Sequence, residues 1–193
     1  MRSGRVAIAA IAWFLVALVV GGSGLLRPVR PPLPQILILS LSAVLLLAFW
    51  RSPEFHAWAL NVDIRALVLI HVSRFVGIYF LILHARGELP YAFAVPGGIG
   101  DIAVAVAAVV VSLLLRRTGA APWRVLFAWN VCGLIDIVLV VATATRLGMA
   151  NPESMRALLT LPLSLLPTFL VPIIISTHIV IFARLWTTRG SEG

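Results

Sequence analysis

Six polar side chains stand inside stretches that are otherwise apolar, and their types are suited to holding a charge or a solute. An ionisable group at the centre of a membrane span costs at least about 2.5 kcal/mol, so such groups usually face the bundle interior and pair. A fixed cation beside titratable carboxylates can form a polar site for a small solute or a proton. The six residues are His71, Arg74, Asp101, Asn130, Asp136 and His178.

The depth of each charge predicts which carboxylate neutralises Arg74. At about 1.5 Å per residue, Arg74 lies roughly 12 Å from the inner surface, Asp136 roughly 17 Å and Asp101 roughly 20 Å. An arginine side chain can stretch several ångströms along the bilayer normal, so we expect Asp136 to be the easier partner and Asp101 the harder one. In this hypothesis Arg74 is the fixed cation and Asn130 a hydrogen-bonding liner of a substrate- or ion-binding site. The alternative is a buried ion pair that only locks two helices together.

The two histidines allow a different chemistry. His71 and His178 fall at similar expected depths on different spans, and two neutral imidazoles can ligate the iron of haem b from opposite sides. The alternative is that each imidazole makes a hydrogen bond within the bundle. Apart from this haem hypothesis, the sequence predicts no cofactor.

Several other chemistries are excluded by composition. All fifteen basic residues are arginine, so no lysine can form a Schiff base. The single cysteine, Cys132, cannot form an internal disulfide or a C-x-x-C-H haem attachment. Neither a Ser-His-Asp pattern nor H-E-x-x-H is found, and four scattered histidines do not make a metal site. We therefore assign no catalytic or metal-binding residue and expect a protein that is not an enzyme.

The elements that position these side chains are predicted to be membrane spans. The chain is 61% hydrophobic and 11% charged, with a mean hydropathy of +1.07, whereas soluble domains are about 45–50% apolar and about 25% charged. We predict an all-α, polytopic membrane protein with short loops, an uncleaved first span and an interfacial helix after Ser52. Its single domain, residues 1–193, would hold six spans at about 6–25, 35–50, 66–84, 96–115, 125–145 and 165–186.

Two regions could interrupt these helices. P-G-G-I-G, residues 96–100, is either an ordinary helix start that lets neighbours pack closely or a loosened turn that exposes backbone groups to a solute. Prolines 162, 167 and 172 remove backbone donors at the start of the last span. Such broken spans occur in transporters and also in inert bundles.

The arginines indicate the orientation of the chain. The net charge of +8 is better explained by topology than by nucleic acid, because arginines gather on the cytoplasmic side of membrane proteins. An inward N-terminus places nine of them inside and five outside, which favours two cytoplasmic termini. The inner nine are Arg2, Arg5, Arg51, Arg65, Arg116, Arg117, Arg124, Arg184 and Arg189, and the outer five are Arg27, Arg30, Arg86, Arg146 and Arg156.

From Arg74 onward the pattern resembles a group of small, uncharacterised multi-span proteins of the bacterial inner membrane. The resemblance is carried by G-E-L-P-Y-A-F-A-V-P-G-G-I-G-D (87–101), by W-N-V-C-G-L-I-D (129–136) and by the proline-broken last span. It covers about half of the chain and implies no activity. It does imply that Arg74, Asp101, Asn130 and Asp136 act as a unit.

Three functions remain open at this stage. The leading hypothesis is carriage of a small solute or a proton through the polar site. The second is electron transfer by haem b, held by His71 and His178. The third is a structural or assembly subunit, in which the protein associates in the lipid bilayer with itself or with a membrane-complex partner.

Overall fold

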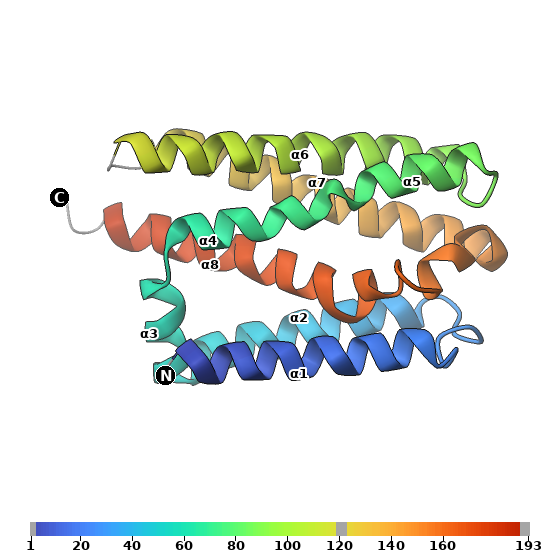
Figure 1. Ribbon diagram of the computed structural model, residues 1–193, viewed down its shortest axis with the longest axis horizontal. Helices are drawn as coiled ribbons and strands as arrows, with labels where there is room; N and C mark the ends of the chain where they lie inside the picture. Colours follow the sequence, from blue (N-terminus) through green and yellow to red (C-terminus); the bar gives the residue numbers. More distant parts are fainter. Residues whose placement is uncertain (1–2, 119–122, 190–193) are drawn as a thin grey trace.

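The computed structural model describes residues 3–118 and 123–189, and within these ranges all regular structure is helical (Figure 1). Six helical segments there are long and apolar enough to cross a membrane, which confirms the predicted all-α, six-span architecture. The protein is therefore a multi-pass integral membrane protein. The segments are Gly4–Gly22, Leu33–Arg51, Ile64–Ala85, Tyr91–Arg116, Trp123–Ala150 and Leu166–Thr187.

The spans are built from eight α-helices and three shorter helical turns within the described residues. The third span combines α4, a 3₁₀ segment and α5, and the last span combines a π-helical turn and α8. In chain order the elements are α1 (Ser3–Gly22), α2 (Leu33–Arg51), α3 (Pro53–Asn61), α4 (Ile64–Leu69), 3₁₀ helix η1 (Ile70–Phe75), α5 (Val76–Ala85), α6 (Tyr91–Thr118), α7 (Trp123–Ala150), 3₁₀ helix η2 (Pro152–Leu159), π turn η3 (Leu166–Leu170) and α8 (Val171–Arg189).

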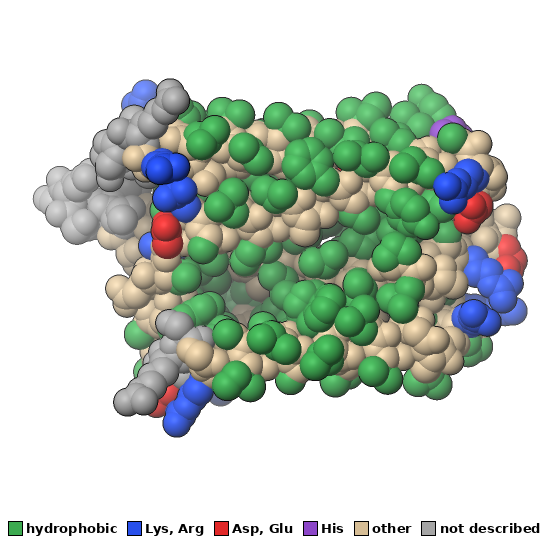
Figure 2. Space-filling view, viewed as in Figure 1, with side chains coloured by type: hydrophobic (Ala, Val, Ile, Leu, Met, Phe, Trp, Pro, Cys, Tyr) green, Lys and Arg blue, Asp and Glu red, His purple; other side chains and the backbone are tan. Residues whose placement is uncertain are grey.

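The spans lie side by side along one long axis (Figure 1). Helix α6 contacts α4, α5 and α7, while α8 lies between this group and α2, with α1 at the outside. Helix α1 begins and α8 ends at the same end of the bundle, and α3 crosses that end (Figure 1). Hydrophobic side chains cover the middle of the surface, and arginines gather at the two ends (Figure 2). This distribution suits contact with a lipid bilayer. Arg2 of the predicted inner set lies outside the described residues, as do the side chains of Arg117 and Arg189.

Helix α3 forms where the sequence predicts an interfacial helix. Ser52 caps it, because its hydroxyl accepts a hydrogen bond of 3.2 Å from the amide of Phe55, and Pro53 occupies the first turn. Its apolar face packs onto the bundle: Ala59 is buried, and Phe55 stacks on Trp58 against the neighbouring apolar cluster. The helix thus closes one end of the bundle.

The apolar core is divided along the bundle axis, and the polar residues singled out above lie between its parts. One cluster occupies the end that carries the termini and includes Phe49, Val68, Ala108, Leu126 and Ile181. Another occupies the opposite end and includes Phe80, Leu83, Phe93, Met155 and Leu163.

The glycine-rich stretch 96–100 lies inside a continuous helix, so both sequence interpretations of it as a helix start or a loosened turn are wrong. Helix α6 begins at Tyr91, and Pro96 is accommodated within it. The expectation that this stretch lets neighbouring helices pack closely is confirmed. The last span, in contrast, is irregular where prolines were noted, since it starts with the π turn before α8.

Helices α5 and α6 touch through their backbones at two glycines. A Cβ added at Gly77 would overlap the carbonyl oxygen of Gly98 and lie 2.9 Å from the Cβ of Asp101. A Cβ added at Gly98 would lie 2.8 Å from the carbonyl oxygen of Gly77. Small residues are the usual way for membrane helices to approach this closely, and here the approach brings α6 and Asp101 against the third span.

We predict that Gly77→Ala destabilises the protein by about 1–3 kcal/mol, because the new methyl group forces α5 and α6 apart. Gly97→Ala is the matched control, since its Cβ would meet only Val140 Cγ2 at 3.4 Å, an ordinary contact. Both changes gain similar helix propensity. Unfolding in mild detergent, followed by circular dichroism, compares the two, and equal stability would contradict the close backbone contact.

Candidate functional site

Arg74 lies in a 3₁₀ segment in the middle of the third span. Helix η1 has three residues per turn, so side chains three apart lie directly above one another. His71 and Arg74 therefore share one face, as their spacing predicts, and both are buried. A 3₁₀ stretch inside a longer helix often marks strain or a functional hinge. Here it places the charged side chain of Arg74 and the titratable side chain of His71 on the same face of the helix.

The guanidinium of Arg74 binds a carboxylate on each of two neighbouring helices. Its Nε donates to Asp101 Oδ1 on α6 at 2.6 Å, and its Nη2 donates to Asp136 Oδ2 on α7. Its Nη1 donates to the carbonyl oxygen of Gly133 at 2.9 Å. The side chains of Arg74 and Asp101 are 1% and 4% exposed, while that of Asp136 is 22% exposed. We call Arg74, Asp101 and Asp136 the charge triad.

Asp136 binds Arg74 as expected, and Asp101, which was expected to be the harder partner, binds it as well and is the more deeply buried of the two. The reason is the early start of α6 at Tyr91, which places Asp101 ten residues, or about 15 Å, along the helix. Asp101 therefore lies near the middle of the membrane, at the depth that Arg74 reaches.

The charge triad is not electrically balanced when all three groups are ionised. One guanidinium and two carboxylates leave one excess negative charge, in a place where most of the ionised surface has lost its water. An uncompensated charge in a bundle interior is costly. One proton on either carboxylate makes the site neutral, so its charge state favours the uptake of one proton or one monovalent cation.

Glycines let the helices come close enough to build the charge triad. A Cβ at Gly100 would overlap Asp136 Oδ1, so the carboxylate of α7 lies directly on the backbone of α6. A Cβ at Gly133 would lie 2.7 Å from the imidazole of His178. The backbone carbonyl of Gly133 is thereby placed between Arg74 and α8.

Asn130 was expected to line the charged site, but it binds His178 instead. Its Oδ1 lies 2.8 Å from His178 Nδ1, and its Nδ2 donates to the backbone carbonyl of His178 at 3.0 Å. His71 Nε2 lies 3.2 Å from Thr177 Oγ1, and Trp129 packs edge-on against the His71 ring. Asn130, His71 and His178 are all 0% exposed. They form a second polar group beside the charge triad.

The two histidines meet, but their geometry does not fit axial ligation of one haem. Their ring centroids are 4.2 Å apart, and the rings are tilted by 46°. Two nitrogens that ligate one iron from opposite sides, each at about 2 Å, hold their ring centroids roughly 6 Å apart with the porphyrin between them. Each ring is also hydrogen-bonded to a neighbouring side chain. The alternative of hydrogen bonding within the bundle describes their surroundings better.

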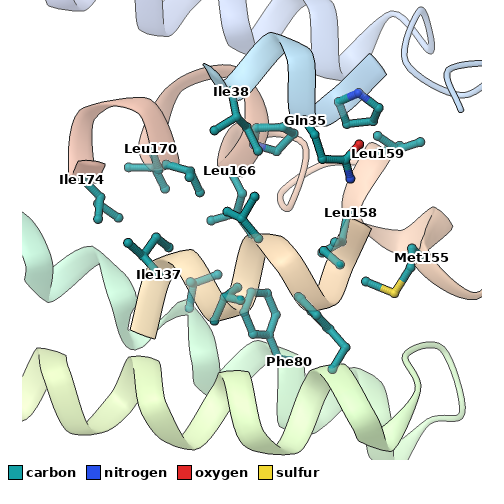
Figure 3. Close-up of a pocket in the computed structure, with 18 of the residues that line it drawn as sticks. Gln35, Ile38, Phe80, Ile137, Met155, Leu158, Leu159, Leu166, Leu170 and Ile174 are labelled. Atoms are coloured by element: carbon teal, nitrogen blue, oxygen red, sulfur yellow. The ribbon is translucent and has the colours of Figure 1, made fainter. Parts of the chain in front are cut away.

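A cavity of about 90 Å³ reaches the charge triad from the end opposite the termini; we call it the first cavity. Arg74, Asp101 and Ser73 lie on its wall, and Gln35 is the other polar side chain among the lining residues. The remaining wall is apolar and comes from α2, α5, α6, α7, η2, η3 and α8 (Figure 3). This volume has room for several water molecules. The first cavity therefore gives a small molecule or water a way to Arg74 and Asp101.

Sequence reasoning missed three components of the site. The carbonyl of Gly133 binds Arg74, but a backbone group gives no residue-type signal. Thr177, next to His178 in sequence, contacts His71, and Gln35 lines the first cavity. Threonine and glutamine commonly make hydrogen bonds between membrane helices, so neither residue stood out. Only their distance from the charged residues in three dimensions identifies them.

The balance of charges predicts that removing the cation and removing one carboxylate have unequal effects on the stability of the protein. Arg74→Gln leaves two buried carboxylates without a cation and should destabilise the protein by about 3–5 kcal/mol. Asp136→Asn keeps one guanidinium opposite one carboxylate, so its cost should be about 1 kcal/mol or less. Unfolding of both variants in mild detergent measures the difference. Equal losses would show that charge balance does not hold this site together.

Comparison with known proteins finds a family but no activity. No curated protein matches the chain, and no solved structure matches it. One family does match, over residues 31–186, which include the charge triad and both buried histidines. Because this match covers more than half of the chain, the protein belongs to the family described as Domain of unknown function (DUF8737).

Proposed function

We propose that the protein carries protons across the membrane by loading and unloading one proton on the charge triad. The observation that supports this most directly is the sharing of one buried guanidinium by two carboxylates. Arg74 stays charged. The excess negative charge is therefore neutralised when a proton binds to a carboxylate and returns when the proton leaves, without movement of a helix. Intramembrane carboxylates in such surroundings are typical of proton pathways.

The first cavity supports access from one side of the membrane. It joins the charge triad to the end of the bundle where α1–α2 and α7–η2 are connected. Its shape also indicates which solute could accompany the proton: a small, mostly apolar molecule with one polar group at Arg74 and Asp101. The broken start of the last span supports movement there, since Leu166 and Pro167 line the cavity and belong to the π turn.

We further propose that the protein lies in a bacterial inner membrane with both termini in the cytoplasm. Helical spans, in contrast to the β-barrels of outer membranes, suit the inner membrane. The position of both chain ends at the same end of the bundle supports a common side (Figure 1), and the excess of arginine at that end supports the cytoplasm.

A purely structural role remains the main competing hypothesis. In that case the charge triad only fixes the register of α5, α6 and α7, and the protein serves as a subunit of a complex or of an oligomer. The two roles differ in one respect: a structural lock works with either carboxylate replaced, whereas a proton carrier does not. The haem alternative gains no support from the imidazole geometry.

Proton flux into proteoliposomes tests the proposal. We expect the purified protein to equilibrate an imposed pH gradient, read by an entrapped pH-sensitive dye, and both Asp101→Asn and Asp136→Asn to slow this at least about tenfold. Glu153→Gln is the matched control, since it removes a carboxylate from an exposed pair with Arg156.

Two outcomes would contradict the proposal. One is a wild-type protein that moves no protons under a membrane potential of either sign. The other is normal flux in both Asn variants with unchanged folding, because the charge triad would then be only a structural lock.

The topology predicts where reporter proteins are active. A fluorescent protein fused after Gly193 should fluoresce, because it would remain in the cytoplasm. Alkaline phosphatase inserted at Gly87, in the α5–α6 turn at the opposite end of the bundle, should be active, because it would be exported. The reverse result in both fusions would place the termini outside.

A further inference from the structure

The hydrogen bonds of His71 identify which ring nitrogen carries a hydrogen. Thr177 has one hydroxyl hydrogen, and its Oγ1 donates it to the carbonyl oxygen of Ile174 at 2.9 Å. With the hydroxyl hydrogen on Ile174, His71 Nε2 is the donor in its 3.2 Å contact with Thr177 Oγ1. In the neutral ring Nδ1 is left as a bare acceptor, and it is buried without a protein partner.

The same reasoning applies to His178. Asn130 uses its amide Nδ2 as a donor to the backbone carbonyl of His178, so its Oδ1 faces the ring and accepts from Nδ1. His178 Nε2 is then the bare acceptor of the neutral ring. It is buried against the backbone of Gly133, where an added Cβ would lie 3.1 Å from it, and it makes no hydrogen bond of regular geometry. Each imidazole thus has one buried ring nitrogen without a regular hydrogen bond, and a buried polar atom of this kind needs an explanation.

The charges around the imidazole pair match one additional proton. Arg74 lies on η1 with His71, and it binds Asp101 on α6 and Asp136 on α7. With both carboxylates ionised they sum to one negative charge, which one imidazolium would balance. A proton can therefore move from a carboxyl group to an imidazole while the total charge of the five groups stays zero.

A second cavity lies next to Thr177, the residue that contacts His71. It has a volume of about 320 Å³ and lies between α1, α2, α3, α4 and α8, at the end of the bundle that carries the termini. Thr177 and Ser176 are on its wall. Thr177 is thus the link between this cavity and His71, whereas the first cavity reaches Arg74 and Asp101 from the opposite end.

We propose that His71, His178 and Thr177 form a proton relay between the charge triad and the second cavity. The relay rests on the proposed function, because it uses the proton that the charge triad binds. A carboxyl group of the triad gives up its proton, and the free lone pair of an imidazole receives it. When His71 Nδ1 takes the proton, Nε2 releases its own proton toward Thr177 and water in the second cavity. Rotation of the ring restores the starting tautomer. Each step moves one proton, and no electron is transferred.

Substitutions at Thr177 test the relay with little change in volume. Thr177→Val keeps the branched shape but removes the hydroxyl, and we expect it to slow proton flux in the dye-loaded proteoliposomes about tenfold or more. Thr177→Ser keeps the hydroxyl and should retain most of the flux. His71→Gln and His178→Gln should also lose flux, whereas His56→Gln and His84→Gln are matched controls outside the relay that should not.

The outcomes separate the relay from the proposed function. If wild-type flux is lost in Asp101→Asn but kept in Thr177→Val, His71→Gln and His178→Gln, the relay is wrong and the charge triad alone moves protons. If the wild type moves no protons, the proposed function itself fails.

A second measurement needs no variant that could misfold. Nitrogen-15 NMR of the wild-type protein in bilayers should show two neutral histidines with opposite tautomers, protonated at Nε2 in His71 and at Nδ1 in His178. A resting His71 protonated at Nδ1 would overturn the relay, because Nδ1 would then have no lone pair to receive a proton.

Discussion

The burial of the Arg74 guanidinium is the constraint on which the rest of the structure depends. A side chain that is 1% exposed in the middle of a membrane protein must find its counter-charges on neighbouring helices. Arg74 finds two, on α6 and α7, and a third acceptor in the Gly133 carbonyl. These bonds fix the depth and rotation of three spans relative to one another, and the apolar clusters on either side pack around that arrangement.

The small residues near Arg74 follow from the same constraint. A guanidinium can bridge two helices only if their backbones come close, and Gly77, Gly98 and Gly100 remove the side chains that would prevent it. In α6 and α7 a glycine stands three residues before the aspartate, at Gly98 and Gly133. Both glycines face a neighbouring helix, α5 for one and α8 for the other. The G-x-x-D spacing thus combines close helix contact with a carboxylate one turn further on.

The helices could be predicted from the sequence, because apolar length and helix caps are local properties. Asn130 and the imidazole contacts could not, since they depend on rotations of α7 and α8 that hydropathy does not encode. The depth of Asp101 was misjudged for a simpler reason. Proline often stands in the first turn of a helix, but α6 begins before Pro96, and five residues of helix change the depth by about 7–8 Å.

The number of carboxylates argues for a role beyond holding helices together. One carboxylate would neutralise Arg74 and join two helices, whereas the second joins a third helix and also adds a negative charge. Two buried imidazoles, each with one ring nitrogen that makes no regular hydrogen bond, offer places for the balancing proton in the proposed path. Cavities approach this set from opposite ends of the bundle, at Asp101 and at Thr177. The proposed proton path uses this order of cavity, carboxylate, imidazole and cavity, whereas fixing the register of helices does not depend on it.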